Sequence, residues 1–305
     1  MIRLMSMLGA VLLVCRVAVV EAADPTWLDR WRDATVALGV VKQAKVMRLG
    51  KEVETRIFAV VGTAVLLGRQ SAESGDRPPI LITAKHVFSD PLKKWNPDTL
   101  RLRFAWFEGR AVEDYLGIEV PLMRDGKPLW MAHPNADIAG LELKINKADA
   151  GRENVATIPF SNFASANEIY EGAQVLVLGY PGAVGRTFWT RALVRGGTIA
   201  WVNPASPATE RLVVDSLLFP GNSGGPVIKV PIGMGRMGGF EVGTIPRFLG
   251  IVSEGRTEQM PLTVDGKEIE IQGPAGKAAI VAGQHIGVAV IEPAAKVREL
   301  IELIK

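Results

Sequence analysis

Short apolar runs separated by glycine- and proline-containing turns are the feature that most constrains the fold of this chain. Such runs are typical of strands, and almost no segment carries the period of an amphipathic helix. The sequence predicts strands near residues 34–41, 57–67, 80–82, 100–107, 137–143, 174–182, 195–201, 211–218, 225–230, 250–255 and 286–291. Many short strands with such turns predict an all-β barrel architecture.

Helix is expected only near the two ends of the mature chain. Trp27, Leu28 and Trp31 lie at helical spacing after a capping sequence, and residues 293–304 form an amphipathic pattern. The polar stretch 144–168 separates two halves. The net charge is only +3 and no Lys/Arg run occurs, so binding to nucleic acid or an anionic membrane has no support.

The first 22 residues are typical of a secretory signal peptide. Arg3 precedes an apolar run, and the sequence around Ala22 offers a small-x-small cleavage site. Cys15 is the single cysteine, and the sequence Leu12-Leu13-Val14-Cys15 only faintly resembles a lipoprotein box, because Val14 stands where a small residue is expected. We therefore expect an exported protein, periplasmic or secreted and bacterial, with no disulfide and no membrane span.

A serine set among glycines, at residues 221–227, is the strongest chemical signal. Glycines allow positive φ and close approach of a substrate carbonyl. The backbone N–H groups of Gly221 and Ser223 are then candidates for binding an oxyanion during acyl transfer. The alternative is a plain glycine-rich hairpin loop.

A base and an orienting acid are available for Ser223. Of three histidines, His86 follows an apolar strand in a short turn, whereas His133, before a proline, is expected on an exposed turn. His285 precedes the last strand, where it lines a pocket or, more simply, has a structural role. Asp137 has apolar neighbours, as an acid that holds a histidine tautomer requires. The alternatives are a structural histidine and an ordinary strand-end aspartate.

The motifs GNSGGP, TAKHV and DIAGLEL together resemble the trypsin-like serine peptidases of the chymotrypsin clan, in particular the protease domain of bacterial HtrA/Deg-type enzymes. The resemblance runs from about residue 34 to the C-terminus. It implies two packed antiparallel six-stranded β-barrels, at about 34–165 and 166–305, with a short C-terminal helix and the site between the barrels. It also implies a catalytic triad of His86, Asp137 and Ser223 acting through an acyl-enzyme.

Departures from relatives bear on regulation and specificity. Asn222 stands where members activated by cleavage carry aspartate, so no zymogen step of that type is expected. Leu217 stands where trypsin-type enzymes bind Arg or Lys, and Val252 where glutamate-specific relatives tend to carry histidine. Small or medium aliphatic side chains are therefore the expected preference. The chain stops about a dozen residues after its last predicted strand, so no PDZ domain is expected.

The segment Ser253-Glu254-Gly255 resembles the strand that pairs with substrate backbone in these enzymes. Residues 256–284, with a tight-turn signal at Val264–Lys267, read as an inserted hairpin that is either a specificity loop or plain surface. No metal or cofactor motif occurs. We expect a serine endopeptidase acting on peptides or unfolded proteins. The alternative is a binding or chaperone-like protein of the same fold with weak, latent or self-directed proteolysis.

Overall fold

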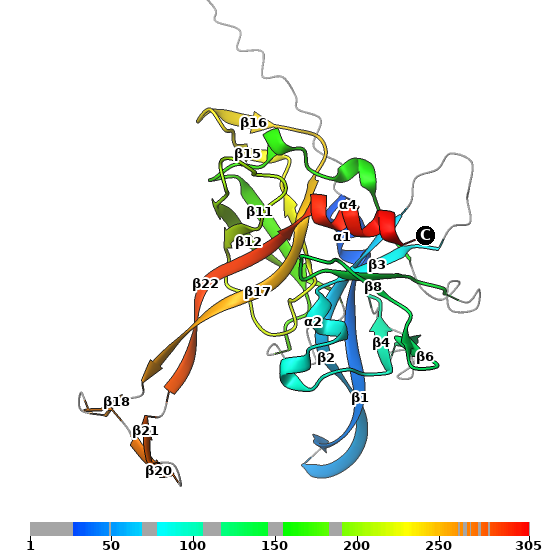
Figure 1. Ribbon diagram of the computed structural model, residues 1–305, viewed down its shortest axis with the longest axis vertical. Helices are drawn as coiled ribbons and strands as arrows, with labels where there is room; N and C mark the ends of the chain where they lie inside the picture. The colour runs from blue at the N-terminus through cyan, green and yellow to red at the C-terminus, as the bar shows by residue number, and fades with distance from the viewer. Residues whose placement is uncertain are drawn as a thin grey trace, which may run out of the picture.

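The computed structural model describes residues 27–304 apart from 49, 69–77, 106–116, 146–154, 183–190, 262, 265–266, 269, 274–275 and 280. The protein is built mainly of strands in two halves, with helix α1 (Trp27–Asp33) at the start and α4 (Ala294–Leu303) at the end (Figure 1). The signal peptide predicted for residues 1–22 lies outside the described residues.

The first half is an eight-stranded sheet with the order β5-β4-β1-β2-β3-β9-β8 and with β10 pairing β2. Its strands are β1 (Thr35–Arg48), β2 (Lys51–Gly68), β3 (Ile80–Thr83), β4 (Thr99–Arg103), β5 (Ile118–Pro121), β8 (Met131–Ala132), β9 (Ala139–Glu142) and β10 (Ile158–Pro159). A small ribbon of β6 (Met123–Arg124) and β7 (Lys127–Pro128) follows β5. The N–H of Leu129 donates to Leu122 O at 2.8 Å, so this ribbon joins the β5 edge to the segment that leads into β8.

The second half is a closed barrel with the strand order β11-β12-β13-β22-β17-β14. The six strands are β11 (Gln174–Gly179), β12 (Leu193–Trp201), β13 (Leu212–Asp215), β14 (Pro226–Lys229), β17 (Arg247–Pro261) and β22 (Val281–Pro293). The predicted all-β, chymotrypsin-like architecture is confirmed. Of the two six-stranded barrels expected, the second half forms one, whereas the described residues of the first half form an eight-stranded sheet, so the expected strand number is wrong there.

Short helices and extra hairpins decorate this framework. The helical turns are α2 (Lys85–Phe88), η1 (Pro91–Lys93), η3 (Phe160–Asn162) and η4 (Ala166–Glu168). The extra strands pair as β15 (Ile232–Met234) with β16 (Phe240–Val242), β18 (Thr263–Val264) with β19 (Lys267–Glu268), and β20 (Glu270–Gly273) with β21 (Gly276–Ala279).

The predicted insertion at 256–284 is a long arm. Strands β17 and β22 continue to pair out to Pro261 and Val281, and two small hairpins follow at the tip (Figure 1). Val264 pairs with Lys267, as the tight-turn signal predicts, and residues 265–266 themselves lie outside the described residues. Periodicity underestimated β17 and β22 because their outer parts leave the barrel, where burial no longer selects apolar residues.

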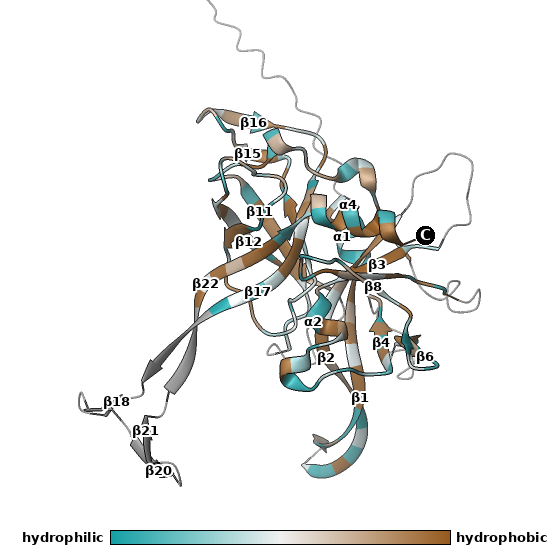
Figure 2. Cartoon of the chain, in the orientation of Figure 1, coloured by the Kyte–Doolittle hydropathy of each residue, from teal (hydrophilic) through white to brown (hydrophobic). Residues whose placement is uncertain are grey.

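Hydrophobic residues follow the inner strands and the buried side of α4, as the brown segments of β3, β4 and β22 illustrate (Figure 2). One core cluster spans both halves, because Trp31 of α1 stacks on Phe248 of β17 and Val297 of α4 is fully buried in the same cluster. The terminal helices therefore pack across the junction of the two halves. Among the described residues, no helix is long and apolar enough to cross a membrane.

The boundary between the two halves, expected near residue 165, stays a prediction. Residues 146–154 lie outside the described part of the chain, and the segment from Val155 onward returns to pair β10 with the first sheet. The chain then continues through η3 and η4 to β11.

Candidate active site

His86 is placed by a fully buried strand that ends in a single helical turn. All four residues of β3 are buried, and α2 begins two residues after its end. The N–H of Lys85 donates to Asp137 O at 3.2 Å, and the N–H of His86 donates to Asp137 Oδ1 at 3.1 Å. The backbone of α2 is thus attached to the segment that carries Asp137, and the His86 ring has little freedom to move away from it.

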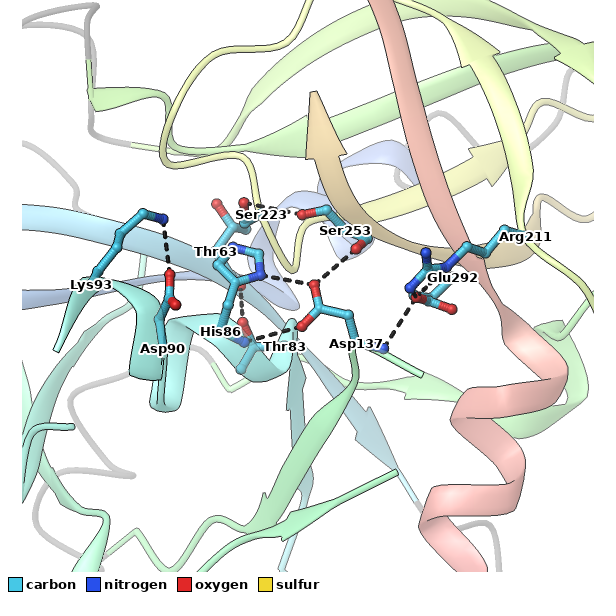
Figure 3. Close-up of polar contacts among 10 residues, drawn as sticks. All are labelled: Thr63, Thr83, His86, Asp90, Lys93, Asp137, Arg211, Ser223, Ser253 and Glu292. Atoms are coloured by element: carbon cyan, nitrogen blue, oxygen red, sulfur yellow. Dashed lines mark hydrogen bonds and ion pairs between the residues drawn. The ribbon is translucent and has the colours of Figure 1, made fainter. Parts of the chain in front are cut away.

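The side chains of His86 and Asp137 form a direct pair (Figure 3). His86 Nδ1 lies 2.8 Å from Asp137 Oδ2, and Ser253 Oγ donates to the same oxygen at 2.8 Å. Burial raises the pKa of Asp137, but hydrogen bonds from His86 and Ser253 outweigh it and hold the pKa below its usual value of 3.8. Because a carboxylate only accepts, Nδ1 carries the proton, and Nε2 of the neutral ring is the acceptor.

Ser223 lies on a tight turn between two left-handed glycines. Gly221 has φ +102° and Gly224 has φ +82°, and a Cβ on Gly224 would lie 2.1 Å from Thr63 O. The Ser223 hydroxyl donates to Ser253 O at 3.4 Å. Within the described residues it makes no hydrogen bond to His86. His86, Asp137 and Ser223 nevertheless line one open cavity of about 480 Å³.

The peptide between Pro220 and Gly221 is oriented by a neighbouring loop. Gly182 N–H donates to Pro220 O at 2.9 Å. Since N–H and C=O of a trans peptide point in opposite directions, the Gly221 N–H points away from Gly182. Among the described residues, neither this N–H nor that of Ser223 has a hydrogen-bond partner. Both predicted oxyanion donors are therefore available for a ligand.

Thr63 attaches the serine turn to the first half, and sequence reasoning missed it. Its Oγ1 donates to Gly221 O at 2.7 Å and accepts from Tyr180 N–H at 3.0 Å, and its own N–H donates to Ser223 O at 2.8 Å. Thr63 is fully buried in β2. A polar residue inside the apolar run of that strand was the available signal, because a buried hydroxyl needs partners.

Three of the four predicted substrate-binding residues line the cavity. Ser253, Glu254 and Gly255 are among its walls, together with Leu218 and Phe219. Leu217 is not among the lining residues: its side chain is 45 % exposed, and its carbonyl accepts from Arg195 Nη1 at 3.0 Å.

On the side of β14, the strand segment 253–255 has no ladder partner among the described residues. The ladder between β14 and β17 ends at the pair Pro226–Ile251, and one further exchange joins Val252 to Gly224 and Gly225. On the other side, register shifts in the pairing with β22 leave Ser253 as a bulge residue. A bulge re-aims a side chain, which here brings Ser253 Oγ to Asp137.

Glu292 and Arg211 adjoin Asp137 on the side away from His86 (Figure 3). Asp137 N–H donates to Glu292 Oε1 at 3.1 Å, and Arg211 Nε donates to the same oxygen at 2.7 Å. Sequence reasoning missed both, since a lone Glu before a proline carries no local signal.

The prediction that His133 lies on an exposed turn is wrong. His133 is 2 % exposed, its Nδ1 accepts from Asn135 N–H at 3.2 Å, and its Nε2 lies 2.9 Å from Glu299 of α4. The turn is covered by α4, a tertiary contact that Pro134 does not reveal. For His285 only the backbone is described, and it pairs with Thr257. The described residues contain no group of three or more His, Cys, Asp or Glu able to hold a metal ion.

In this mostly β-stranded protein, Ser223 lines the same cavity as the His86–Asp137 pair, an arrangement typical of serine peptidases. The family comparison is more specific. The trypsin-like peptidase domain matches residues 62–233, which is 172 residues (233 − 62 + 1) and more than half of the 305 in the chain. The chain belongs to this family. The matched span contains His86, Asp137 and Ser223, but ends before Ser253.

Among solved structures, 176 chains match. One is an HtrA-type protease, AlgW, with a decapeptide, at 16 % sequence identity and a TM-score of 0.44. The match covers 88 % of this chain and 63 % of that chain, so this chain spans less than two thirds of the length of its structural match. No curated protein matches.

Proposed function

We propose that this protein is an exported serine endopeptidase in which Ser223 is the nucleophile, His86 the general base and Asp137 the orienting acid. The observation that carries the proposal is the 2.8 Å pair between His86 Nδ1 and Asp137 Oδ2 in the cavity that Ser223 also lines. Membership of the trypsin-like peptidase family supports it. No cofactor or metal enters the proposal.

The chemistry proceeds through an acyl-enzyme. Asp137 holds the His86 tautomer in which Nε2 is free to take the proton from Ser223 Oγ as that oxygen attacks the scissile carbonyl. The Gly221 and Ser223 N–H groups stabilise the negative oxygen of the tetrahedral intermediate. His86 then gives the proton to the leaving amine. Water repeats the sequence to release the acyl group, with His86 again as base.

The nucleophile must turn before it reacts. In the resting protein Ser223 Oγ contacts Ser253 O at 3.4 Å, and rotation about χ1 would bring it toward His86. Catalytic hydrogen bonds are often long in free enzymes and tighten when substrate binds. The same contact favours the second candidate, a peptide-binding protein of this fold with latent or self-directed proteolysis.

Substrates would bind as extended peptides of low sequence demand. On its β14 side, the segment 253–255 can pair with a peptide backbone, which fits segments of unfolded proteins. The cavity beside Ser223 has Leu218 and Val252 among its walls, and both are buried and apolar. We therefore propose small or medium aliphatic residues before the scissile bond. A cleavage profile dominated by Arg, Lys or Glu would contradict this preference.

The deciding experiment compares the mature protein from Ala23 onward with its Ser223→Ala variant. Both are treated with a fluorophosphonate probe and with unfolded casein. The wild type is expected to label and to cleave, and the variant to lose activity by about 10⁵-fold or more. Undiminished labelling of the variant would mean that Ser223 is not the nucleophile. Absence of labelling and cleavage in both proteins would favour the peptide-binding candidate.

A further inference from the structure

Glu292 occupies a position that apolar residues normally take. It lies near the end of β22 with 2 % exposure, and its backbone pairs with Ile251 of β17. Gly250, at φ +146°, passes so close to Glu292 that a Cβ there would lie 1.9 Å from Glu292 O. The backbone of Glu292 is therefore fixed beside Ile251, which lies two residues before Ser253 in β17. The side chain of Glu292 reaches the N–H of Asp137.

A single carboxylate oxygen serves two partners there. Glu292 Oε1 accepts from Asp137 N–H at 3.1 Å and from Arg211 at 2.7 Å (Nε) and 2.6 Å (Nη2). The carboxylate of Glu292 is buried whereas Arg211 is half-exposed, and taking a carboxylate out of water costs free energy that an ion pair seldom repays. We therefore explain Glu292 by what it holds, which is the backbone of Asp137.

The opposite charges of Glu292 and Arg211 nearly cancel. Glu292 adds a second carboxylate beside Asp137, and the half-exposed Arg211 neutralises it. A hydrogen bond from the guanidinium to Glu292 raises the pKa of Arg211, and the charges of Glu292, Asp137 and Glu254 act in the same direction. Asp137 is thus left as the net negative charge that faces His86.

We propose that Glu292 is a positioning residue for Asp137 and that Arg211 and Glu292 together set the pH at which the His86–Asp137 pair takes up its proton. The kinetic part of this inference rests on the proposed function, whereas the titration does not. Other charged groups on the elements around the pair are, by element, Lys85 on α2, Asp90 and Lys93 at η1, Glu254 and Arg256 on β17, and His133 and Glu299 between the Asp137 loop and α4.

Substitutions of Glu292 and of Arg211 should shift the protonation midpoint of the His86–Asp137 pair in opposite directions, which a purely structural role would not produce. In Glu292→Gln the amide oxygen still accepts from Asp137 N–H, but Arg211 is left uncompensated and opposes a positive imidazole. The pair then protonates at lower pH, by about half a pH unit. In Arg211→Met the uncompensated Glu292 favours the positive imidazole, and the midpoint moves up by a similar amount. The double variant returns the midpoint close to that of the parent.

The measurement is an NMR titration of the imidazole resonances in the Ser223→Ala background, with His86 identified by its loss in His86→Gln. Glu168→Gln and Arg247→Met are matched controls, because that pair also joins two elements, with Nε 2.7 Å from Oε1, but lines a different cavity. They are expected to leave the midpoint unchanged. Midpoints of both test variants within 0.1 unit of the parent, or shifted in the same direction, would overturn the proposal.

Kinetic measurements provide a second test of the proposal. Glu292→Ala, which removes the acceptor of Asp137 N–H, is expected to lower kcat about tenfold with KM little changed, and Glu292→Gln to restore most of it. The acid limb of the kcat/KM profile should shift as the titration does. If the parent enzyme shows no peptidase activity, the proposed function fails while the titration still decides this inference. If Glu292 variants do not fold, the half-exposed Arg211→Met decides it alone.

Discussion

At the scale of single residues, the donors around Asp137 determine the behaviour of the site. Three hydrogen bonds reach its carboxylate, from His86 N–H, His86 Nδ1 and Ser253 Oγ. They overcome the burial that raises its pKa, and the net pKa lies below 3.8. The carboxylate is therefore charged across the neutral pH range, as an acid that orients a histidine must be.

This lowered pKa predicts how stability depends on pH. Because the folded pKa of Asp137 lies below the unfolded one, the ionised group stabilises the fold above about pH 3.8, and this contribution is lost as the pH falls through the folded pKa. Asp137→Asn lacks it. Urea unfolding between pH 6 and pH 2.5 should therefore show a steeper acid loss in the wild type. Parallel pH profiles for the two proteins would contradict the assignment, and Ser223→Ala should follow the wild type.

At the scale of elements, close backbone approach explains why β17 carries glycine at position 250. The φ of +146° and the 1.9 Å approach to Glu292 O leave no room for a side chain. We expect Gly250→Ala to destabilise the protein by about 3 kcal/mol or more, measured as the free energy of unfolding in urea. Gly196→Ala on β12, where no atom lies within 4 Å of the added Cβ, is the control and should change it by less than about 1 kcal/mol. Equal effects of the two substitutions would refute this explanation.

Loss of the Gly250 geometry should also impair the site, because β17 carries Ser253 and β22 carries Glu292. The long arm formed by these strands beyond the barrel was anticipated only as a hairpin. Inside the barrel, the burial of one face specifies the strand register. The sequence pattern beyond the barrel does not show how far the pairing of β17 and β22 continues.

At the scale of the whole molecule, one threonine connects the two halves at the serine turn. Thr63→Val keeps the shape of the side chain but leaves Gly221 O and Tyr180 N–H without their buried partner. We expect a loss of about 2–3 kcal/mol in stability and at least tenfold slower fluorophosphonate labelling well below the melting temperature.

Thr35→Val is the matched control for this prediction. Thr35 is equally buried and its Oγ1 donates to Trp31 O at 2.7 Å, and among the described residues it has no hydrogen bond to the serine turn. It should lower the melting temperature while leaving the labelling rate intact. If Thr63→Val labels as fast as Thr35→Val, the link between the halves does not organise the turn.

From the sequence we predict the strand-rich class, both terminal helices and the candidate residues His86, Asp137 and Ser223, because period, turn chemistry and local motifs are short-range properties. The surroundings of these residues depend on tertiary contacts that the sequence does not reveal. Thr63, Glu292, Arg211 and the buried His133 meet partners far along the chain, from Tyr180 to Glu299. A hydrogen bond between distant residues depends on how strands pair and helices cross, and neither residue of such a pair identifies the other in the sequence.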